Sequence, residues 1–454
     1  MSTSNEAARP YRKLLATLFD EAVRAVGGRQ ALYANSVVEA DRWLYRRGGQ
    51  EVCVQLPQRS GTGKVFVLGA GKAAASLAHG LEQVLGDRID AGLVIVKRGH
   101  REDLQRVGIV EASHPTPDLS SVQATQQLLA LLRTTSDADT IFFVLSGGAS
   151  SLLFAPAADL SYQAKAAAVQ LLVNSGAPIE EINVVRRHLS AVKGGRLRLQ
   201  ARCAQFCTLA ISDVISDDPA TIGSGPTVAD ASTFGDALDV VERHELRGKL
   251  PAAVIACLQR GAQGLEEETP ERGDATFRDD VYQIVASNRV SLATCMDAAR
   301  KLGYPAEIVS ENMAGNTHAA ARSFASTLAA AARSPQNSGS PSLFFAGGET
   351  TLSVSQGGKG GRNQEFALVA ASELQDIPNV VLLSAGTDGT DGPTDAAGAF
   401  ADGATIERAR ALGFDPQEHL RRHDVYPLLE ALGDLHRTGP TGTNVMDLVI
   451  GVAF

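Results

Sequence analysis

The sequence has few cysteines, no long apolar run and no excess of positive charge, and each shortage excludes a class of protein. Its five cysteines are scattered and form no CxxC pair, which excludes a disulfide framework and favours a reducing cytoplasm. No apolar run reaches the length of a membrane span. The formal net charge of −9 argues against nucleic acids and anionic membranes as partners, because both favour a basic face. We therefore expect a soluble, cytoplasmic protein.

The chain is too long for one hydrophobic core. At 454 residues it is expected to form two α/β domains. The apolar pattern changes near Leu250, and an acidic, polar run follows at residues 266–274. We predict an N-terminal domain over residues 1–250, a linker or exposed connection over 251–280, and a C-terminal domain over 281–454.

The first candidate site follows a predicted strand at residues 65–68. The strand runs into Gly69, Gly71 and Lys72, and an alanine-rich helix begins directly after them. Strand, tight glycine turn and helix start come here in the order that phosphate binding requires. The flexible ammonium group of Lys72 can reach a phosphate or a developing charge.

The same loop matches the dinucleotide fingerprint G-x-G-x-x-A, but the next strand departs from a NAD site. A NAD site ends that strand in Asp or Glu, which holds the ribose hydroxyls. Here the strand at residues 92–96 ends in Lys97-Arg98-Gly99-His100, whose cations suit a phosphate or a carboxylate. The same cations could hold the 2′-phosphate of NADP. This pattern therefore argues against a reductase without excluding one. The loop also lacks the Gly-Lys-Ser or Gly-Lys-Thr of a Walker A motif.

A second glycine turn, SGGASS, follows the predicted strand at residues 140–145. Its serine hydroxyls and backbone N–H groups would face an anion at a helix start. The nucleophile elbow G-x-S-x-G is absent, so we favour binding of an oxyanion or a carboxylate over nucleophilic catalysis. The expected ligand contacts in this turn are Ser146, Gly147, Gly148 and Ser150.

Three other features of the N-terminal half have two interpretations each. His114, in a loop with two prolines, either binds substrate or is a structural hydrogen-bonding group. Helical spacing allows Arg186, Ser190 and Lys193 on one face, where they either meet solvent or converge on the ligand of Lys72; we favour Lys193 near the site. Asp213 lies in an acidic loop after a strand. It either binds a metal or acts as a general base, or it is part of a solvent-exposed acidic turn.

The densest cluster lies between Gly357 and Asp395. Four glycines around Lys359 precede Arg362, and a predicted helix follows. Glycine lets a backbone approach a ligand closely, and a helix start offers free N–H groups, so this stretch and its last glycine, Gly361, predict an anion site. Another predicted strand, at 343–346, ends at the candidate nucleotide contacts Gly347, Gly348 and Glu349.

An acidic loop follows the strand predicted at residues 380–383. Within nine residues it carries three threonines and three carboxylates interleaved with glycines. Such hard oxygen ligands at the end of a strand suit Mg²⁺ with phosphate, whereas the alternative is a surface turn. The three carboxylates are Asp388, Asp391 and Asp395.

Several of these motifs resemble those of the glycerate 2-kinase family, some members of which are labelled hydroxypyruvate reductase. GGRNQEFAL and GTDGTDGPTDAAGA are similar to the family's C-terminal MOFRL domain, and GAGKA, SGGASSL and KGGRL resemble its N-terminal motifs. The match extends along most of the chain. It implies an α/β protein of two domains, an N-terminal Rossmann-like three-layer α/β/α domain and a C-terminal α/β MOFRL-type domain.

The resemblance also implies a reaction, the transfer of the ATP γ-phosphoryl group to the 2-hydroxyl of D-glycerate in an inter-domain cleft. It carries an active-site role onto Lys72. Arg362 suits bidentate recognition of a phosphate or carboxylate, an aspartate would take the hydroxyl proton, and further carboxylates would hold Mg²⁺ or Mn²⁺. The expected catalytic residues are Lys72, Arg362, Asp213 and Asp388, and the expected metal ligands are Asp391 and Asp395.

Two other functions stay open. An NAD(P)H-dependent hydroxypyruvate reductase would bind a nicotinamide cofactor, and a non-catalytic sugar-acid binding protein would bind without turnover. The expected partners of the kinase are the small molecules D-glycerate and ATP, with no nucleic acid or membrane; a homodimer is compatible with the sequence.

Overall fold

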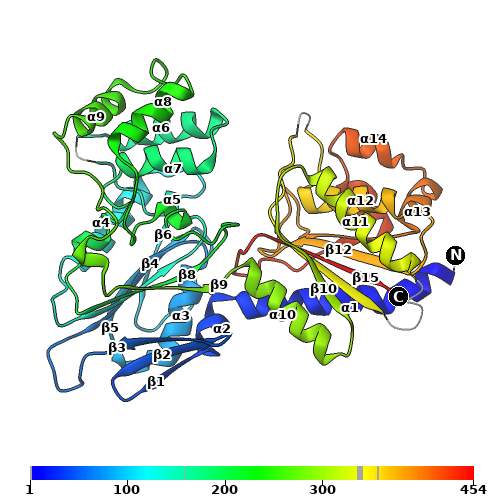
Figure 1. Cartoon of the computed structure of the whole chain (residues 1–454), viewed down its shortest axis with the longest axis horizontal. Helices are drawn as coiled ribbons and strands as arrows, with labels where there is room; N and C mark the ends of the chain where they lie inside the picture. Colours follow the sequence, from blue (N-terminus) through cyan, green and yellow to red (C-terminus); the bar gives the residue numbers. More distant parts are fainter. Residues whose placement is uncertain (1–2, 158, 335–340, 355–356) are drawn as a thin grey trace. The chain divides into compact units, whose positions relative to one another are not determined.

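The structure is a computed structural model that describes residues 3–157, 159–334, 341–354 and 357–454. The chain divides into two units, which Figure 1 shows in the colours of the sequence. The first unit comprises residues 28–285, and the second comprises residues 1–27 together with residues 286–454.

The first unit is built on a six-stranded sheet with the order β6-β5-β4-β7-β8-β9. The strands are β4 (Val65–Ala70), β5 (Ile89–Lys97), β6 (Gly108–Ala112), β7 (Thr140–Leu145), β8 (Gln205–Ile211) and β9 (Val281–Ala286). The pairs β4–β5, β4–β7, β5–β6 and β7–β8 are parallel. Strands β4 and β7 are buried along their whole length, as expected for parallel strands that are covered on both faces.

This strand order confirms the predicted Rossmann-like fold. Counted outward from the first strand, the order corresponds to the 3-2-1-4-5-6 arrangement of dinucleotide-binding sheets. The order reverses between β4 and β7, so the turns after these two strands lie at the topological switch point. Open α/β sheets bind ligands at that point.

Helices complete the layers of the first unit (Figure 1). Helix α4 (Leu119–Leu132) packs on the sheet face formed by Phe66, Leu68 and Phe143. Helix α3 (Ala74–Leu85) contacts β4, β5 and β7, and the short α2 (Gly28–Tyr33) packs on α3.

A group of helices with its own apolar core and a small sheet extend the first unit. The helices of this group are α6 (Tyr162–Asn174), α7 (Ile179–His188), α8 (Phe234–Arg243) and α9 (Ala252–Ala262), and a short helix α5 (Ala149–Leu152) follows β7. The small antiparallel sheet, which our sequence analysis did not predict, consists of β1 (Ser36–Glu39), β2 (Arg42–Arg47) and β3 (Gln50–Gln55).

The second unit has a mixed six-stranded sheet in the order β10-β11-β15-β12-β13-β14. Its strands are β10 (Ala306–Met313), β11 (Ser342–Gly348), β12 (Val380–Gly386), β13 (Gly398–Asp402), β14 (Leu435–His436) and β15 (Asp447–Ala453). Strands β10 and β11 are parallel, whereas β15 runs antiparallel to both β11 and β12. The carboxyl ends of β11 and β12 therefore lie beside the amino end of β15.

Helices cover both faces of this second sheet (Figure 1). One face packs on α11 (Thr317–Arg333) and α12 (Arg362–Glu373), and the other on α1 (Thr3–Val26) and α10 (Asn288–Lys301). The remaining helices are α13 (Thr405–Ala411), α14 (Pro416–Arg421) and α15 (Tyr426–Leu432). None of the helices in the described ranges combines the length and apolarity that a membrane crossing requires.

The residue ranges of the two units differ from those of the two domains predicted from the sequence. Leu15, Leu18 and Phe19 of α1 are buried against the sheet of the second unit, although they come first in the chain. The expected linker at residues 251–280 contains α9, whose apolar side is part of the helical core of the first unit. Helical periodicity shows that a helix has an apolar side, but it does not show which sheet that side will cover.

Arg12 anchors α1 within the second unit through buried charges. Its guanidinium donates to Asp434 at 2.5 Å and to Asp402 at 2.6 Å, and Arg408 also contacts both carboxylates. Asp434 is fully buried. Burial alone would lower the pKa of Arg12, but the two carboxylates outweigh burial and raise it.

We predict that Arg12→Met destabilises the protein by up to the roughly 3–5 kcal/mol that follows the loss of one partner of a buried ion pair, because Arg408 compensates only part of the loss. Urea unfolding measures the effect. Arg24→Met, on an exposed side of the same helix, is the matched control and should be neutral. Equal stabilities of the two variants would show that apolar contacts alone hold α1.

Candidate functional site

Two glycine turns meet at the switch point of the first sheet. The N–H of Lys72 donates to the carbonyl of Gly147 at 2.9 Å, and Ser146 Oγ accepts from the N–H of Ala73 at 3.0 Å. Gly71 has a φ of 141°, and a Cβ atom at this position would clash with Ser146. Residue 71 must therefore be glycine so that the turn after β4 approaches the turn after β7.

Asp213 and His114 lie beside the second turn. A Cβ atom at Gly147 would clash with the carboxylate of Asp213, and one at Gly148 would lie 2.9 Å from His114 Nε2 and 3.3 Å from Lys72 Cγ. These close approaches bring an ammonium, a carboxylate and an imidazole around one turn. We call Lys72, His114, Gly147, Gly148 and Asp213 the Lys72 site.

The environment changes the protonation of two members of the Lys72 site. Burial raises the pKa of Asp213, although the charge of Lys72 opposes the rise. Burial, followed by the charge of Lys72, lowers the pKa of His114 to about 4, so the imidazole is neutral at pH 7. A carboxylate with a raised pKa is a better proton acceptor than an ordinary aspartate, and a neutral imidazole can donate or accept a hydrogen bond.

A small cavity of about 190 Å³ adjoins the Lys72 site and shares His114 and Gly148 with it. The other polar side chains of its lining are Ser150, Ser151, Arg186 and Lys193. We call this space the basic cavity. Helical spacing placed Arg186, Ser190 and Lys193 on one face, and the first and last of these line the basic cavity.

The helix that was expected to carry these residues ends earlier than predicted. Helix α7 stops at His188, and Gly194 and Gly195 adopt left-handed φ values of 56° and 79°. Lys193 reaches the basic cavity from a turn, while Ser190 Oγ donates to the carbonyl of Ala155 outside it. Our prediction of one continuous helical face was therefore wrong, although Arg186 and Lys193 do line the same space.

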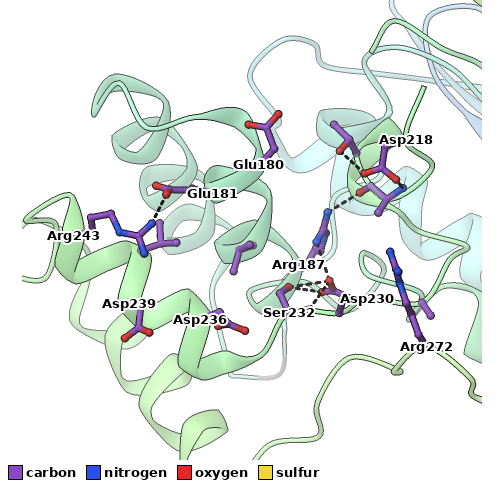
Figure 2. A pocket seen from close by; sticks show the side chains of 16 residues that line it. Glu180, Glu181, Arg187, Asp218, Asp230, Ser232, Asp236, Asp239, Arg243 and Arg272 are labelled. Carbon is purple, nitrogen blue, oxygen red and sulfur yellow. Dashed lines mark hydrogen bonds and ion pairs between the residues drawn. The ribbon is translucent and has the colours of Figure 1, made fainter. Parts of the chain in front are cut away.

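A larger cavity of about 490 Å³, shown in Figure 2, lies between α7, α8 and the loop around Asp230. Six acidic and three basic side chains line it. Two of its arginines already have carboxylate partners, since Arg187 donates to Asp230 at 2.8 Å and Arg243 pairs with Glu181. This excess of acid disfavours an anionic substrate here.

The second unit brings Arg362 to the adjoining ends of β11, β12 and β15. Arg362 Nε donates to Asp447 Oδ2 at 2.6 Å, Nη2 donates to Oδ1 at 2.9 Å, and Nη1 lies 2.8 Å from Glu349. In the sheet, Gly348 and Gly386 both pair with Asp447. Burial alone would lower the pKa of Arg362, but the hydrogen bonds and charge of Asp447 outweigh burial and raise it.

The bidentate contact predicted for Arg362 therefore exists with a carboxylate of the chain itself. Sequence analysis missed Asp447, and the available signal was an isolated acid at the start of the last apolar strand. Glu349, one of the predicted nucleotide contacts, is the second partner of the guanidinium. Asp388 lies close to Asp447, since a Cβ atom at Gly386 would be 3.5 Å from Oδ1 of each. We call Arg362, Glu349, Asp388 and Asp447 the Arg362 site.

Asp391 occupies the start of α12, where the sequence predicted that a ligand anion would bind. Its carboxylate accepts from the backbone N–H groups of Asn363 and Gln364 at 3.0 and 2.9 Å. A Cβ atom at Gly361 would clash with this carboxylate. Burial raises the pKa of Asp391 to about 6, although the two N–H donors oppose the rise. The positive end of the helix is thus compensated from within the chain.

The other two carboxylates of the acidic loop diverge. Asp388 Oδ1 accepts from both the N–H and the hydroxyl of Thr390 at 3.0 Å. Asp395 accepts from Tyr426 at 2.7 Å and from Arg437 at 3.0 Å. Within the described residues, no group of three or more His, Cys, Asp or Glu is arranged to hold a metal ion. The metal-binding roles of Asp391 and Asp395 remain predictions.

Several glycines predicted to contact a ligand are required by the packing of the chain itself. A Cβ atom at Gly69 would clash with the carbonyl of Val144 on the neighbouring strand. One at Gly347 would clash with Asn288, and one at Gly348, whose φ is 142°, with the backbone of Met313. These close approaches explain the glycines without a ligand.

Two family descriptions match this chain. A family described as "Domain of unknown function (DUF4147)" matches residues 14–259, and the MOFRL family matches residues 342–447.

Named relatives and solved structures extend the comparison over nearly the whole chain. A glycerate 2-kinase of Pyrococcus horikoshii is 35% identical over 98% of both chains, and a D-glycerate 2-kinase of Thermotoga maritima is 38% identical over 86% of this chain and 90% of its own length. A relative from Agrobacterium vitis, provisionally named a hydroxypyruvate reductase, is 36% identical over 96% of this chain and 93% of its own.

The crystal structure of a protein from Pyrococcus horikoshii OT3 matches with a TM-score of 0.83, 35% identity and coverage of 98% of both chains. The crystal structure of a glycerate kinase from Thermotoga maritima matches with a TM-score of 0.84, 34% identity and coverage of 98% of this chain and all of that chain.

The raised pKa of Asp391 leads to a prediction about stability. Between the ordinary pKa of 3.8 and about 6, the folded state binds more protons at this residue than the unfolded chain does. The contribution of Asp391 to the free energy of unfolding should therefore fall as the pH rises through this range. The stability of the wild type minus that of Asp391→Asn should decrease from about pH 4 to about pH 6, as measured by urea unfolding.

Asp395→Asn is the matched control with the opposite sign. The hydrogen bond from Tyr426 lowers the pKa of Asp395, so its contribution is lost as the pH falls. A stability difference for Asp391→Asn that depends on Mg²⁺ rather than on pH would instead support a metal-binding role.

Proposed function

Because the chain belongs to the glycerate 2-kinase family, we propose that it transfers the γ-phosphoryl group of ATP to the 2-hydroxyl of D-glycerate. The observation that carries this proposal is the Lys72 site, where an ammonium group and a carboxylate of raised pKa meet at the switch point of a Rossmann-like sheet. Phosphoryl transfer depends mainly on positioning and on compensation of negative charge. A cation and a proton acceptor beside one turn meet both needs.

In the proposed reaction, Asp213 takes the proton of the 2-hydroxyl as its oxygen bonds to the γ-phosphorus. The bond from that phosphorus to the bridging oxygen breaks, and ADP leaves. Lys72 stabilises the negative charge of the phosphoryl group that is transferred. The neutral imidazole of His114 orients the hydroxy-acid substrate by a hydrogen bond. The raised pKa of Asp213 supports its role as the proton acceptor.

The Arg362 site is proposed to act on the phosphates of the same pair of substrates. Arg362 retains a positive charge, but Asp447 and Glu349 offset it, so it orients a phosphate rather than supplying a full net charge. Mg²⁺ or Mn²⁺ would neutralise the phosphates. Mg²⁺ often takes one or two protein carboxylates together with phosphate oxygens. Asp388 fits such an ion better than Asp391 or Asp395, because both oxygens of the other two carboxylates accept hydrogen bonds, whereas the bonds to Asp388 use Oδ1.

The purified protein should convert ATP and D-glycerate to ADP and 2-phosphoglycerate in the presence of Mg²⁺ or Mn²⁺. Coupling through enolase measures this product, because enolase accepts the 2-phosphate directly, whereas the 3-phosphate first needs a mutase. NADH and NADPH should not be oxidised with hydroxypyruvate, because the proposed reaction uses no nicotinamide; for NADH, the end of β5 at Lys97 also lacks the acid that holds a ribose. Nicotinamide oxidation without ATP would overturn the kinase in favour of the reductase.

The two cations should respond differently to substitution. Lys72→Met should lower kcat/KM by about 10²-fold or more, as for the loss of one preorganised donor, with little change in stability. Arg362→Met should lower activity and also stability, because the buried Asp447 loses its bidentate partner. The exposed Lys64→Met is the control. Near-normal turnover of Lys72→Met would remove that residue from the mechanism.

A further inference from the structure

We propose that the basic cavity binds the carboxylate of the hydroxy-acid substrate, with Arg186 and Lys193 as the residues that determine specificity for an acid. This inference rests on the proposed function for the identity of the substrate. The cavity shares His114 and Gly148 with the Lys72 site, so an acid held there would present its neighbouring hydroxyl to that site.

Lys193 is buried without an opposite charge. Its side chain is 1% exposed, and the ammonium group donates to the carbonyl and hydroxyl of Ser150 at 2.9 and 3.1 Å and to the carbonyl of Gly223 at 3.4 Å. All these acceptors are neutral, and no ion pair of Lys193 occurs within the described ranges. Burial lowers its pKa, and nearby Arg186 lowers it further. A buried ammonium in such surroundings is favoured by a bound anion.

Arg186 shows the same lack of compensation. Its Nε is buried without a hydrogen-bond partner in the part of the chain that the structure describes, and burial lowers the pKa of its guanidinium. The buried arginines Arg187 and Arg198 of the first unit are paired with Asp230 and Asp280. Arg196, which is half-buried like Arg186, donates to the carbonyls of Ser190 and Glu267. Arg186 differs from all three, because no acceptor of its guanidinium occurs among the described residues.

A second polar atom in the cavity lining is also unsatisfied. His114 Nδ1 is buried and has no hydrogen-bond partner among the described residues. Most buried polar groups in folded proteins do have one, so two neighbouring exceptions around one cavity, beside a buried ammonium whose acceptors are all neutral, require an explanation. An oxyanion in the cavity would compensate the two cations, and the imidazole would add a hydrogen bond.

The size of the cavity distinguishes the acid from the nucleotide. Its volume of about 190 Å³ lies below the roughly 300–1,000 Å³ typical of sites for drug-sized ligands. A three-carbon acid is compatible with that space, whereas a nucleoside triphosphate is not. In D-glycerate the 2-hydroxyl is attached to the carbon next to the carboxylate, so a carboxylate in the basic cavity keeps that hydroxyl close to the Lys72 site.

The test is the effect of Arg186→Met and Arg186→Gln on each substrate separately. Both variants should raise the KM for D-glycerate by about 10- to 100-fold, on the scale of a lost hydrogen bond to a charged group, while the KM for ATP changes less than about threefold. Lys193→Met should have the same effect if it folds. Lys165→Met is the matched control, because this nearby buried lysine donates to Ala155 and does not line the cavity.

Calorimetric binding without ATP gives a readout that is independent of turnover. The wild type should bind D-glycerate at least about tenfold more tightly than the neutral D-glyceramide, and the Arg186 variants should lose this preference. A raised KM for ATP alone would assign the cavity to a nucleotide phosphate, and unchanged values for both substrates would overturn the proposal. If the wild type has no kinase activity, the proposed function fails, while the comparison of glycerate with glyceramide still decides whether the cavity binds a carboxylate.

Discussion

The compensation of buried charge is the constraint that distinguishes the two candidate sites. In the second unit, carboxylates of the chain compensate the half-buried cations Arg12 and Arg362 and the start of α12, as Asp447 does for Arg362 and Asp391 for α12. In the first unit, Arg186 and Lys193 lie beside one cavity, and among the described residues Lys193 has only neutral acceptors and Arg186 Nε has none. Since isolated charge is unfavourable away from water, the first unit is the better candidate for binding an anion tightly before the reaction.

The internal compensation in the second unit has a different use. A guanidinium that is fixed by two hydrogen bonds to Asp447 loses little freedom when a phosphate binds, so its position is set in advance. In the proposed reaction, this neutralised charge would also limit the affinity of the site for ADP. The Arg362 site is therefore suited to orientation, and the Lys72 site to charge stabilisation and proton transfer.

The fold was predictable because its signals are local. Apolar runs that end in glycine mark β4 and β7, and both predicted turns are found at the switch point. The features that sequence analysis missed depend on contacts between distant residues. The docking of α1, the cap that Asp391 provides for α12 and the pairing of Asp447 with Arg362 each join segments that periodicity treats separately. The spacing of Arg186, Ser190 and Lys193 also fits a helix, although helix α7 stops at His188.

The glycines show why a motif alone does not identify a ligand. Gly69 and Gly71 satisfy the G-x-G-x-x-A spacing, yet close packing against Val144 and Ser146 already requires them. The same spacing therefore arises wherever a turn at a switch point packs against the next strand, whether or not a nucleotide binds there. A buried cation without a charged partner, by contrast, is electrostatically unfavourable and is not required by close packing of the backbone. Lys165 also has no ion pair among the described residues, but it donates to Ala155, lies over the ring of Phe154 and does not line the cavity, whereas Arg186 and Lys193 both line it. For this chain, Arg186 and Lys193 are therefore a stronger indication of a ligand than its glycine turns.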